Sequence, residues 1–321
     1  MNYSKASRNY YGYFFIAPFI IGFLLFGLYP VYNTLYLSFT DTTLMNAASA
    51  KWIGLDNFKR LFADDFFMRA VRNTWSLWLL NFIPQIGIAM LISVWFTNAR
   101  LKIKFVGTWR ALFYLPNLLM PASVAALFFS LFSFYGPVNQ ILVRANLIPE
   151  AIDFIRSEST MRGLVVFIQW WTWFGQTIII LMAGMTSIPT TLYEAALVDG
   201  ANSVQMFRYI TLPLLKSVMV YIFVTSLVGG MQMFDIPYLL TDGRGSPNSS
   251  ILTNNILMYM KFRSSKGHIG SAASVGVLIF IMTSICSLAI FYFLRDKDTP
   301  EEREKTLKRQ AKALTRQEKA R

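Results

Sequence analysis

Apolar residues fall in six long runs that are separated by polar segments. A bilayer core about 30 Å thick needs about 20 apolar helical residues, and each run meets that length. Five runs hold no Asp, Glu, Lys or Arg, and the fifth along the chain holds Lys216 at its start and Asp235 near its end. The runs cover residues 12–37, 74–97, 111–134, 163–185, 215–236 and 271–294. The pattern predicts an all-α membrane protein with six transmembrane helices.

The first run differs from a cleaved leader. It follows Lys5 and Arg8, is too long for the apolar core of a signal peptide and lacks an obvious small-residue cleavage site. We therefore expect a retained first span. In the second run, Trp75, Trp78 and Trp95 are placed as interfacial anchors would be.

Composition agrees with a membrane protein. The 321 residues are 55% hydrophobic and 15% charged, whereas an average soluble domain is about a quarter charged. The net charge of +13 comes from residues that flank the apolar runs, which does not match the basic stripe of a nucleic-acid-binding domain. The chain has one cysteine, Cys286, and one histidine, His268. We therefore predict no disulfide within the chain, no metal site and no catalytic residue.

Lysine and arginine counts predict the orientation. Eighteen of the 30 lie on the side that carries the N-terminus, the 98–110 connection, the segment 186–214 with its flank, and the tail 295–321. The opposite loops carry many acidic residues. We therefore expect both termini in the cytoplasm. The tail favours a solvated helix or disorder, and a regulatory or partner contact is the alternative.

The segment 186–214 is polar and contains turn residues, unlike the runs beside it. Pro189 is expected to end the preceding helix, and Thr191 with Glu194 has the pattern of a capping box for a short helix that ends at Asp199. Gly200 suits the left-handed position after that helix.

The same segment contains signals for a second helix. Asn202 with Gln205 has the spacing of another capping box, and Pro213 is expected to interrupt this second helix as the chain re-enters the membrane. The segment therefore predicts a helix, a glycine turn and a helix. An ordinary connecting loop between spans is the alternative.

This segment resembles the EAA loop of ABC importer permeases, EAA-x3-G-x9-I-x-L-P. The fixed positions are all matched, by Glu194, Ala195, Ala196, Gly200, Ile210, Leu212 and Pro213. Residues 53–58, 73–74, 110–116, 183–189 and 240–243 resemble the carbohydrate branch, which contains the maltose permease large subunit and the glycerol-3-phosphate permease. One departure is at 242–245, where relatives often have Gly-Gly-Pro, and we expect a loop change there.

The resemblance implies a type I ABC importer permease fold with a cytoplasmic coupling helix. That helix would dock on an ATPase subunit through Glu194, with Asp199 and Arg208 as further polar contacts. ATP and Mg²⁺ would be used by partner ATPase subunits, since this chain has no G-x-x-x-x-G-K-[ST] loop. The implied division is 1–68 for the N-terminal segment, first span and outer loop, 69–294 for a five-span transport domain, and 295–321 for the tail.

A polar face on the fourth run is a candidate substrate pathway. Gln169, Thr172, Trp173 and Gln176 recur at i, i+3, i+4 and i+7 and so share one helix face. Amides and an indole suit a sugar, and the resemblance places these positions against substrate in the maltose permease. Contacts that hold one span to another are the alternative.

The fifth run offers a second candidate face. Ser226, Gly230 and Met233 follow at i, i+4 and i+7, with Gln232 nearby, and correspond to substrate-contacting positions of the same relative. Gly230 and Met233 replace amides there, which implies a different or bulkier substrate. Asp235 is either part of this pathway or a span-end residue in water.

The sequence thus indicates a permease subunit that forms half of a pathway for a sugar or oligosaccharide in the bacterial cytoplasmic membrane. Another polyhydroxylated or anionic solute, such as glycerol phosphate or an acidic oligosaccharide, is the alternative. The implied partners are a second homologous permease, two ATPase subunits and a solute-binding protein that meets the outer loops 38–72, 135–162 and 237–270. A secondary carrier or membrane enzyme is disfavoured by the scarcity of ionisable residues within the spans.

Overall fold

The computed structural model describes residues 7–47, 49–98, 101, 103–241 and 243–294. The tail 295–321, for which a solvated helix or disorder is expected, lies outside this part of the chain. Six helical stretches in the described residues are long and apolar enough to cross a membrane, which confirms the predicted fold class. They are Gly12–Ser38, Asp65–Thr97, Pro121–Arg144, Glu158–Thr186, Lys216–Leu240 and Ile269–Leu294.

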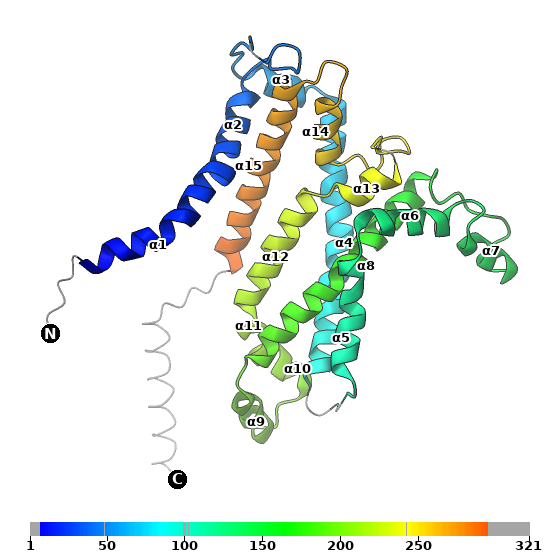
Figure 1. Ribbon diagram of the computed structural model, residues 1–321. Helices are drawn as coiled ribbons and strands as arrows, with labels where there is room; N and C mark the ends of the chain where they lie inside the picture. Colours follow the sequence, from blue (N-terminus) through cyan, green and yellow to red (C-terminus); the bar gives the residue numbers. More distant parts are fainter. Residues whose placement is uncertain (1–6, 48, 99–100, 102, 242, 295–321) are drawn as a thin grey trace. The chain divides into compact units, whose positions relative to one another are not determined.

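Short helices supplement the long ones (Figure 1). The α-helices are α1 (Ser7–Phe23), α2 (Tyr29–Ser38), α3 (Asp56–Phe62), α4 (Asp65–Thr97), α5 (Val106–Tyr114), α6 (Pro121–Phe132), α7 (Pro137–Arg144), α8 (Glu158–Thr186), α9 (Thr190–Val198), α10 (Ser203–Met206), α11 (Leu212–Leu214), α12 (Lys216–Met231), α13 (Asp235–Leu240), α14 (Asn254–Phe262) and α15 (Ile269–Leu294). Wider π-helical turns occupy Leu24–Leu28 and Phe207–Thr211, and a 3₁₀ turn occupies Leu115–Leu118.

The third apolar run is not the single helix that its length predicts. Helix α5 ends at Tyr114, and α6 begins only at Pro121. The reason is the two prolines: Pro116 lacks the amide hydrogen that would continue α5, whereas Pro121 is well suited to the first turn of a new helix. The prediction of a continuous helix over 111–134 is wrong for this reason.

The backbone packs as two compact units. One combines the chain up to Phe82 with Leu119–Trp170 and Gly229–Ser284, and the other combines Ile83–Leu118, Trp171–Val228 and the chain from Ile285. We call these two packed units, in the order given, the first unit and the second unit. The predicted divisions at 68/69 and 294/295 concern segments of the sequence instead of packing, and they remain a prediction.

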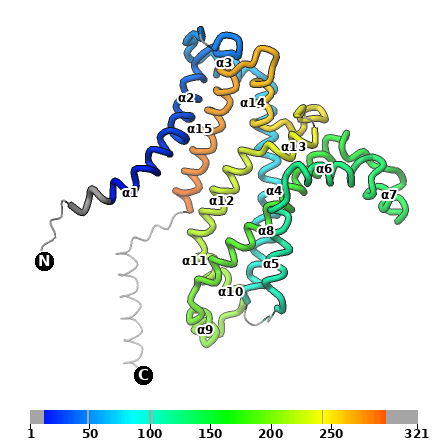
Figure 2. Tube along the Cα trace, viewed as in Figure 1, coloured from blue at the N-terminus to red at the C-terminus, as the bar shows by residue number. Residues whose placement is uncertain are grey.

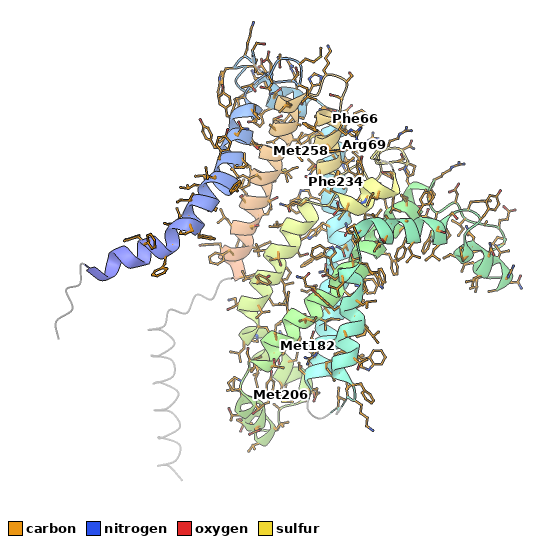
Figure 3. All side chains as sticks on the ribbon, viewed as in Figure 1. Phe66, Arg69, Met182, Met206, Phe234 and Met258 are labelled. Carbon is orange, nitrogen blue, oxygen red and sulfur yellow. The ribbon has the colours of Figure 1, made fainter. Side chains whose placement is uncertain are left out.

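In the first unit, loops 39–64 and 243–268 lie together with the starts of α4 and α8 and form what we call the loop layer (Figure 2). The buried amide of Asn57 donates to the carbonyls of Ser38 and Thr40 at 2.9 and 2.7 Å. A Cβ at Gly270 would lie 2.1 Å from the Thr40 carbonyl oxygen, so only glycine lets α15 start this close to the loop. Met258, labelled in Figure 3, packs from α14 towards Gly276 of α15.

In the second unit, α8 crosses α5 at Gly175, where a Cβ would lie 1.9 Å from the carbonyl oxygen of Phe113. Polar bonds join α8 to α4: Gln85 donates to Thr177 at 2.8 Å, and Ser93 donates to the Ile178 carbonyl at 3.2 Å. These contacts fix the part of α8 from which the polar segment 186–214 emerges.

Candidate coupling segment and translocation pathway

The segment 186–214, which we call the coupling segment, begins with a short exposed helix. Helix α9 runs from Thr190 to Val198 and has Pro189 as its N-cap residue. No side chain caps its start, so the predicted capping box of Thr191 and Glu194 is wrong. Pro189, whose φ is −58°, is followed at once by helix, and Thr191 is therefore the second helical residue instead of the cap.

Gly200 ends this helix as predicted. Its φ is +79°, a conformation that glycine adopts without strain. The Ala201 amide donates to the Ala196 carbonyl at 2.8 Å, and the Gly200 amide donates to the Leu197 carbonyl at 3.1 Å. This pair of bonds is the Schellman arrangement. Nothing lies within 4 Å of a Cβ built at Gly200, so conformation and not space requires glycine here.

The second half of the coupling segment begins with the predicted capping box. Asn202 accepts from the Gln205 amide at 2.9 Å, and Gln205 accepts from the Asn202 amide at 2.8 Å. Pro213, expected to interrupt the helix, lies within the three-residue α11, which ends at Leu214, and α12 begins only at Lys216. The π-helical turn Phe207–Thr211 directly precedes α11.

One side-chain hydrogen bond joins the two halves. The Tyr193 hydroxyl on α9 and the Thr211 hydroxyl before α11 lie 2.8 Å apart. Thr211 is buried, at 6% exposed, so the bond is anchored at the base of the segment. It joins positions 18 apart in sequence, on either side of the Gly200 turn.

The coupling segment exposes polar and apolar side chains together. Glu194, Ala195, Asp199, Gly200, Arg208, Leu212 and Pro213 are exposed, and Ala196 and Ile210 are half-buried. Three large apolar side chains stand beside them: Val198, Val204 and Tyr209 are 88%, 73% and 71% exposed. The Arg208 guanidinium lies 5.9 Å from the centre of the Tyr209 ring. Such a surface, apolar and rimmed by charge, is typical of a protein-binding site.

The candidate face of the fourth span lies on α8, where the helix is continuous through all four positions. Gln169 is buried, Thr172 and Gln176 are half-buried, and Trp173 is 44% exposed. The Thr172 carbonyl also accepts a hydrogen bond of 3.2 Å from Asn117. Trp173 is therefore the most accessible group on this face, and its role in transport remains a proposal.

The candidate face of the fifth span is shorter than expected. Helix α12 ends at Met231, so Met233 does not continue the face of Ser226 and Gly230, and that part of the prediction is wrong. Met233 is only 4% exposed, whereas Gln232 is exposed. The turn between α12 and α13 separates these two residues from the helical face. Asp235 begins α13 and is exposed.

Gly230 lies against a tryptophan that the sequence assigns to the membrane interface. A Cβ at Gly230 would lie 2.0 Å from Cδ1 of Trp78 on α4. Trp78 is 7% exposed and stacks on Phe82 with 5.1 Å between ring centres. The interfacial role predicted for Trp78 is wrong, because its indole packs inside the first unit on the backbone of α12.

The loop layer contains an arginine that sequence analysis does not single out. The Arg162 guanidinium on α8 donates to Asn73 Oδ1 at 2.9 Å, to the Ser250 carbonyl at 2.8 Å and to the Ser76 hydroxyl. Asn73 in turn donates to the carbonyls of Ser249 and Leu252. The only sequence signal is an arginine directly beside an apolar run.

The loop layer contains other charge contacts, of which two involve residues of its second loop. Lys261 pairs with Asp64 at 2.9 Å. Arg263 donates to the Tyr259 hydroxyl at 3.3 Å, and this bond lowers the pKa of the Tyr259 phenol. No group of three or more His, Cys, Asp or Glu side chains gathers in the described ranges.

Comparisons with known proteins agree with this geometry. A family model described as "Binding-protein-dependent transport system inner membrane component" matches residues 62–297. The lactose transport system permease protein LacF of Rhizobium radiobacter is 31% identical over 297 residues, which are 90% of this chain and 97% of that protein. The arabinooligosaccharides transport system permease protein AraP of Bacillus subtilis (strain 168) is 31% identical over 291 residues, covering 89% of this chain and 88% of that protein.

A solved structure has the same fold. The crystal structure of a bacterial ABC transporter involved in the import of the acidic polysaccharide alginate matches with a TM-score of 0.76 and 24% identity. The match covers 91% of this chain and 98% of that chain. A second structure of an alginate ABC transporter, in complex with an alginate pentasaccharide-bound periplasmic protein, matches with a TM-score of 0.75 and 23% identity, covering 90% and 95%.

Proposed function

Because the chain belongs to the family of binding-protein-dependent transport system inner membrane components, we propose that it is the permease subunit of an ATP-driven saccharide importer. Two relatives that are 31% identical along nearly their whole length are named for lactose and for arabinooligosaccharides. The Multiple sugar-binding transport system permease protein MsmF of Streptococcus mutans is 29% identical over 90% of this chain. These names support a saccharide over an amino acid or a metal ion.

The coupling segment is the observation that carries the proposal. Helix α9 is a two-turn helix held at its base by Tyr193 and ended by a Gly200 turn. Its exposed surface combines Val198 with the charges of Glu194 and Asp199. We assign this surface to an ATPase subunit, because apolar contacts with charge-assisted hydrogen bonds at the rim suit a docked helix. ATP and Mg²⁺ belong to that subunit.

The complete transporter would contain two permeases, two ATPase subunits and a solute-binding protein. In this arrangement the chain supplies half of the pathway, its coupling segment and both termini face the cytoplasm, and the loop layer faces the binding protein. The excess of Lys and Arg beside the coupling segment and in the 98–110 connection supports this orientation.

Within the second unit, we assign Thr172, Trp173 and Gln176 of α8 and Ser226 of α12 to the pathway. The exposed indole of Trp173 offers an apolar face to a sugar ring, and the amide of Gln176 offers hydrogen bonds to hydroxyls. Gln169 extends this face by one turn at its buried end. Gly230, Gln232 and Met233 are weaker candidates because α12 ends at Met231.

The test is ATP-dependent uptake into proteoliposomes by the complete complex with its binding protein. Radiolabelled lactose, arabinotriose, alginate trisaccharide and glycerol 3-phosphate are compared, and we expect uptake of a saccharide. The matched control is a complex with Glu194→Lys in this chain, which should assemble in the membrane and carry nothing. Uptake of glycerol 3-phosphate alone would replace the saccharide assignment, and wild-type uptake by Glu194→Lys would remove the coupling role.

A further inference from the structure

One face of α4 meets two other helices of the first unit. Thr74, Trp78 and Asn81 follow at i, i+4 and i+7 and therefore line one face of α4. The end of α12 reaches this face, since Gly230 lies against Trp78. The start of α14 reaches it as well, since the Asn254 backbone amide donates to the Thr74 hydroxyl at 3.1 Å.

Two amide side chains at this place are buried with hydrogen-bonding capacity unused. Asn254 is 0% exposed, and neither its Oδ1 nor its Nδ2 has a hydrogen-bond partner among the described residues. Asn81 is 6% exposed, and its Oδ1 has none in the same ranges. Burial of an amide group without a partner is unfavourable, and native proteins keep few such groups.

Other buried asparagines of the same unit are bonded. The side chain of Asn139 donates to three backbone carbonyls and accepts from the Ile152 amide. Asn57 and Asn73 each donate to two carbonyls. The unit is therefore able to satisfy a buried asparagine, and Asn81 and Asn254 differ from these three in having unbonded side-chain atoms.

Trp78 adds an aromatic surface on α4 between Asn81 and Thr74, the residue that bonds the Asn254 backbone. Its indole stacks on Phe82, and Trp75 meets it edge-on with 5.6 Å between ring centres. Amide groups that lack partners can bond sugar hydroxyls, and an indole can pack on the C–H face of a pyranose. Neither property is needed for a span that only packs against its neighbours.

Resting on the proposed function, we propose that Trp78, Asn81 and Asn254 form a saccharide-binding position on α4 and α14. It is separate in sequence from the candidate faces of α8 and α12. In this structure the indole covers Gly230 and the position is closed. The sugar reaches the amides when Trp78 leaves Gly230, so Trp78 both contacts the substrate and controls access to it.

The deciding variants are Asn254→Leu and Asn81→Leu in the complete reconstituted transporter. Leucine has nearly the same size and removes the unbonded polar atoms, so the melting temperature should stay unchanged or rise. Uptake per ATP hydrolysed, at saturating loaded binding protein, should fall about tenfold, as for the loss of a substrate hydrogen bond. The probe is lactose or arabinotriose, whichever the wild type carries. Trp78→Phe, which keeps an aromatic face, should lose less uptake than Trp78→Leu.

Gln85→Leu is the matched control. Gln85 is a buried amide of α4 that donates to Thr177 at 2.8 Å and belongs to no surface assigned above, so its removal should lower the melting temperature and leave uptake per ATP unchanged in the folded fraction. Normal uptake per ATP in both Asn254→Leu and Asn81→Leu would overturn the proposal. If Asn254→Leu does not fold, Asn81→Leu decides alone. A wild type that carries no saccharide at all is a different outcome, which refutes the proposed function.

Discussion

The loop layer of the first unit and the coupling segment of the second unit are fastened in opposite ways. In the loop layer, Arg162 and Asn73 hold residues 249–252 through bonds between positions 86 to 179 apart in sequence. In the coupling segment, the side-chain bonds described for the Asn202 cap and for Tyr193 join positions 3 and 18 apart. The loop layer is therefore fastened by bonds between residues distant in sequence, and the coupling segment is fastened mostly by bonds between its own residues.

This difference suits two kinds of partner contact. A surface that receives a soluble binding protein repeatedly gains affinity when it is preorganised, since little conformational freedom is lost on binding. A helix that moves with an ATPase subunit has to keep its own shape while its attachment to the rest of the chain bends. The local caps of α9 and α10 preserve that shape, and few side-chain bonds restrain the segment as a whole.

The largest effect is expected for Gly200→Asp in the coupling segment. The substitution places a carboxylate at an exposed turn beside the proposed ATPase contact and puts an L-residue at φ +79°. An unpaired charge buried at an interface costs about 2–5 kcal/mol, so uptake should fall about 30-fold or more. Uptake is measured in proteoliposomes, and the amount of folded transporter is measured by gel filtration.

Gly200→Asn separates charge from conformation. Asparagine has the shape of aspartate, carries no charge and tolerates the left-handed region better than most residues. Nothing lies within 4 Å of a Cβ there, so no clash is introduced. We expect uptake within about fivefold of wild type, since the left-handed conformation costs about 1 kcal/mol or less for asparagine. Equal loss in both variants would contradict a charge-sensitive contact.

The next effect is expected in the loop layer, for Arg162→Leu. The variant loses hydrogen bonds to Asn73, Ser76 and Ser250. Bonds from a charged donor contribute about 1.5–3 kcal/mol each. Because water replaces part of the lost bonding, the free energy of unfolding should fall by about 3 kcal/mol. The melting temperature of the purified complex measures this loss.

Arg156→Leu is the control for that experiment. Its side chain is 89% exposed and pairs with Asp153 only at 3.9 Å, so its removal should change stability by less than about 1 kcal/mol. Arg162→Lys should fall between the two, because lysine keeps the charge and loses the forked geometry. A melting temperature for Arg162→Leu equal to that of Arg156→Leu would show that the network does not fasten the loop layer.

The same contrast explains what the sequence predicts. The six spans follow from composition, and the Gly200 turn and the cap of Asn202 follow from rules that act within a few residues. The Thr191 cap fails at the same scale, because Pro189 already takes the N-cap position two residues earlier. Local rules therefore predict most of the coupling segment. What they do not decide is which of two nearby residues, Pro189 or Thr191, takes the N-cap position of α9.

Features built from distant residues are not predictable in this way. Trp78 and Gly230 are separated by 152 positions, and nothing near either one indicates that an indole packs on that glycine. The unbonded side-chain amide of Asn254 is likewise revealed only when α4 and α14 are placed together in the structure. The sequence reveals the candidate faces of α8 and α12 by their period, but not that α12 stops at Met231.

The smallest effect is expected for Tyr193→Phe. This variant tests most directly whether bonds between its own residues hold the coupling segment together. It removes the one hydroxyl bond described between α9 and the base at Thr211. A neutral hydrogen bond contributes about 1 kcal/mol, so sugar carried per ATP hydrolysed should fall about fivefold while ATP hydrolysis continues. Thr211→Val should give the same loss, and the double variant should add nothing to it, since both remove one bond. Tyr221→Phe is the matched control, because that ring is 55% exposed and lies on α12 outside the coupling segment. An additive double variant would show that the two hydroxyls act separately and that α9 transmits force through the backbone alone.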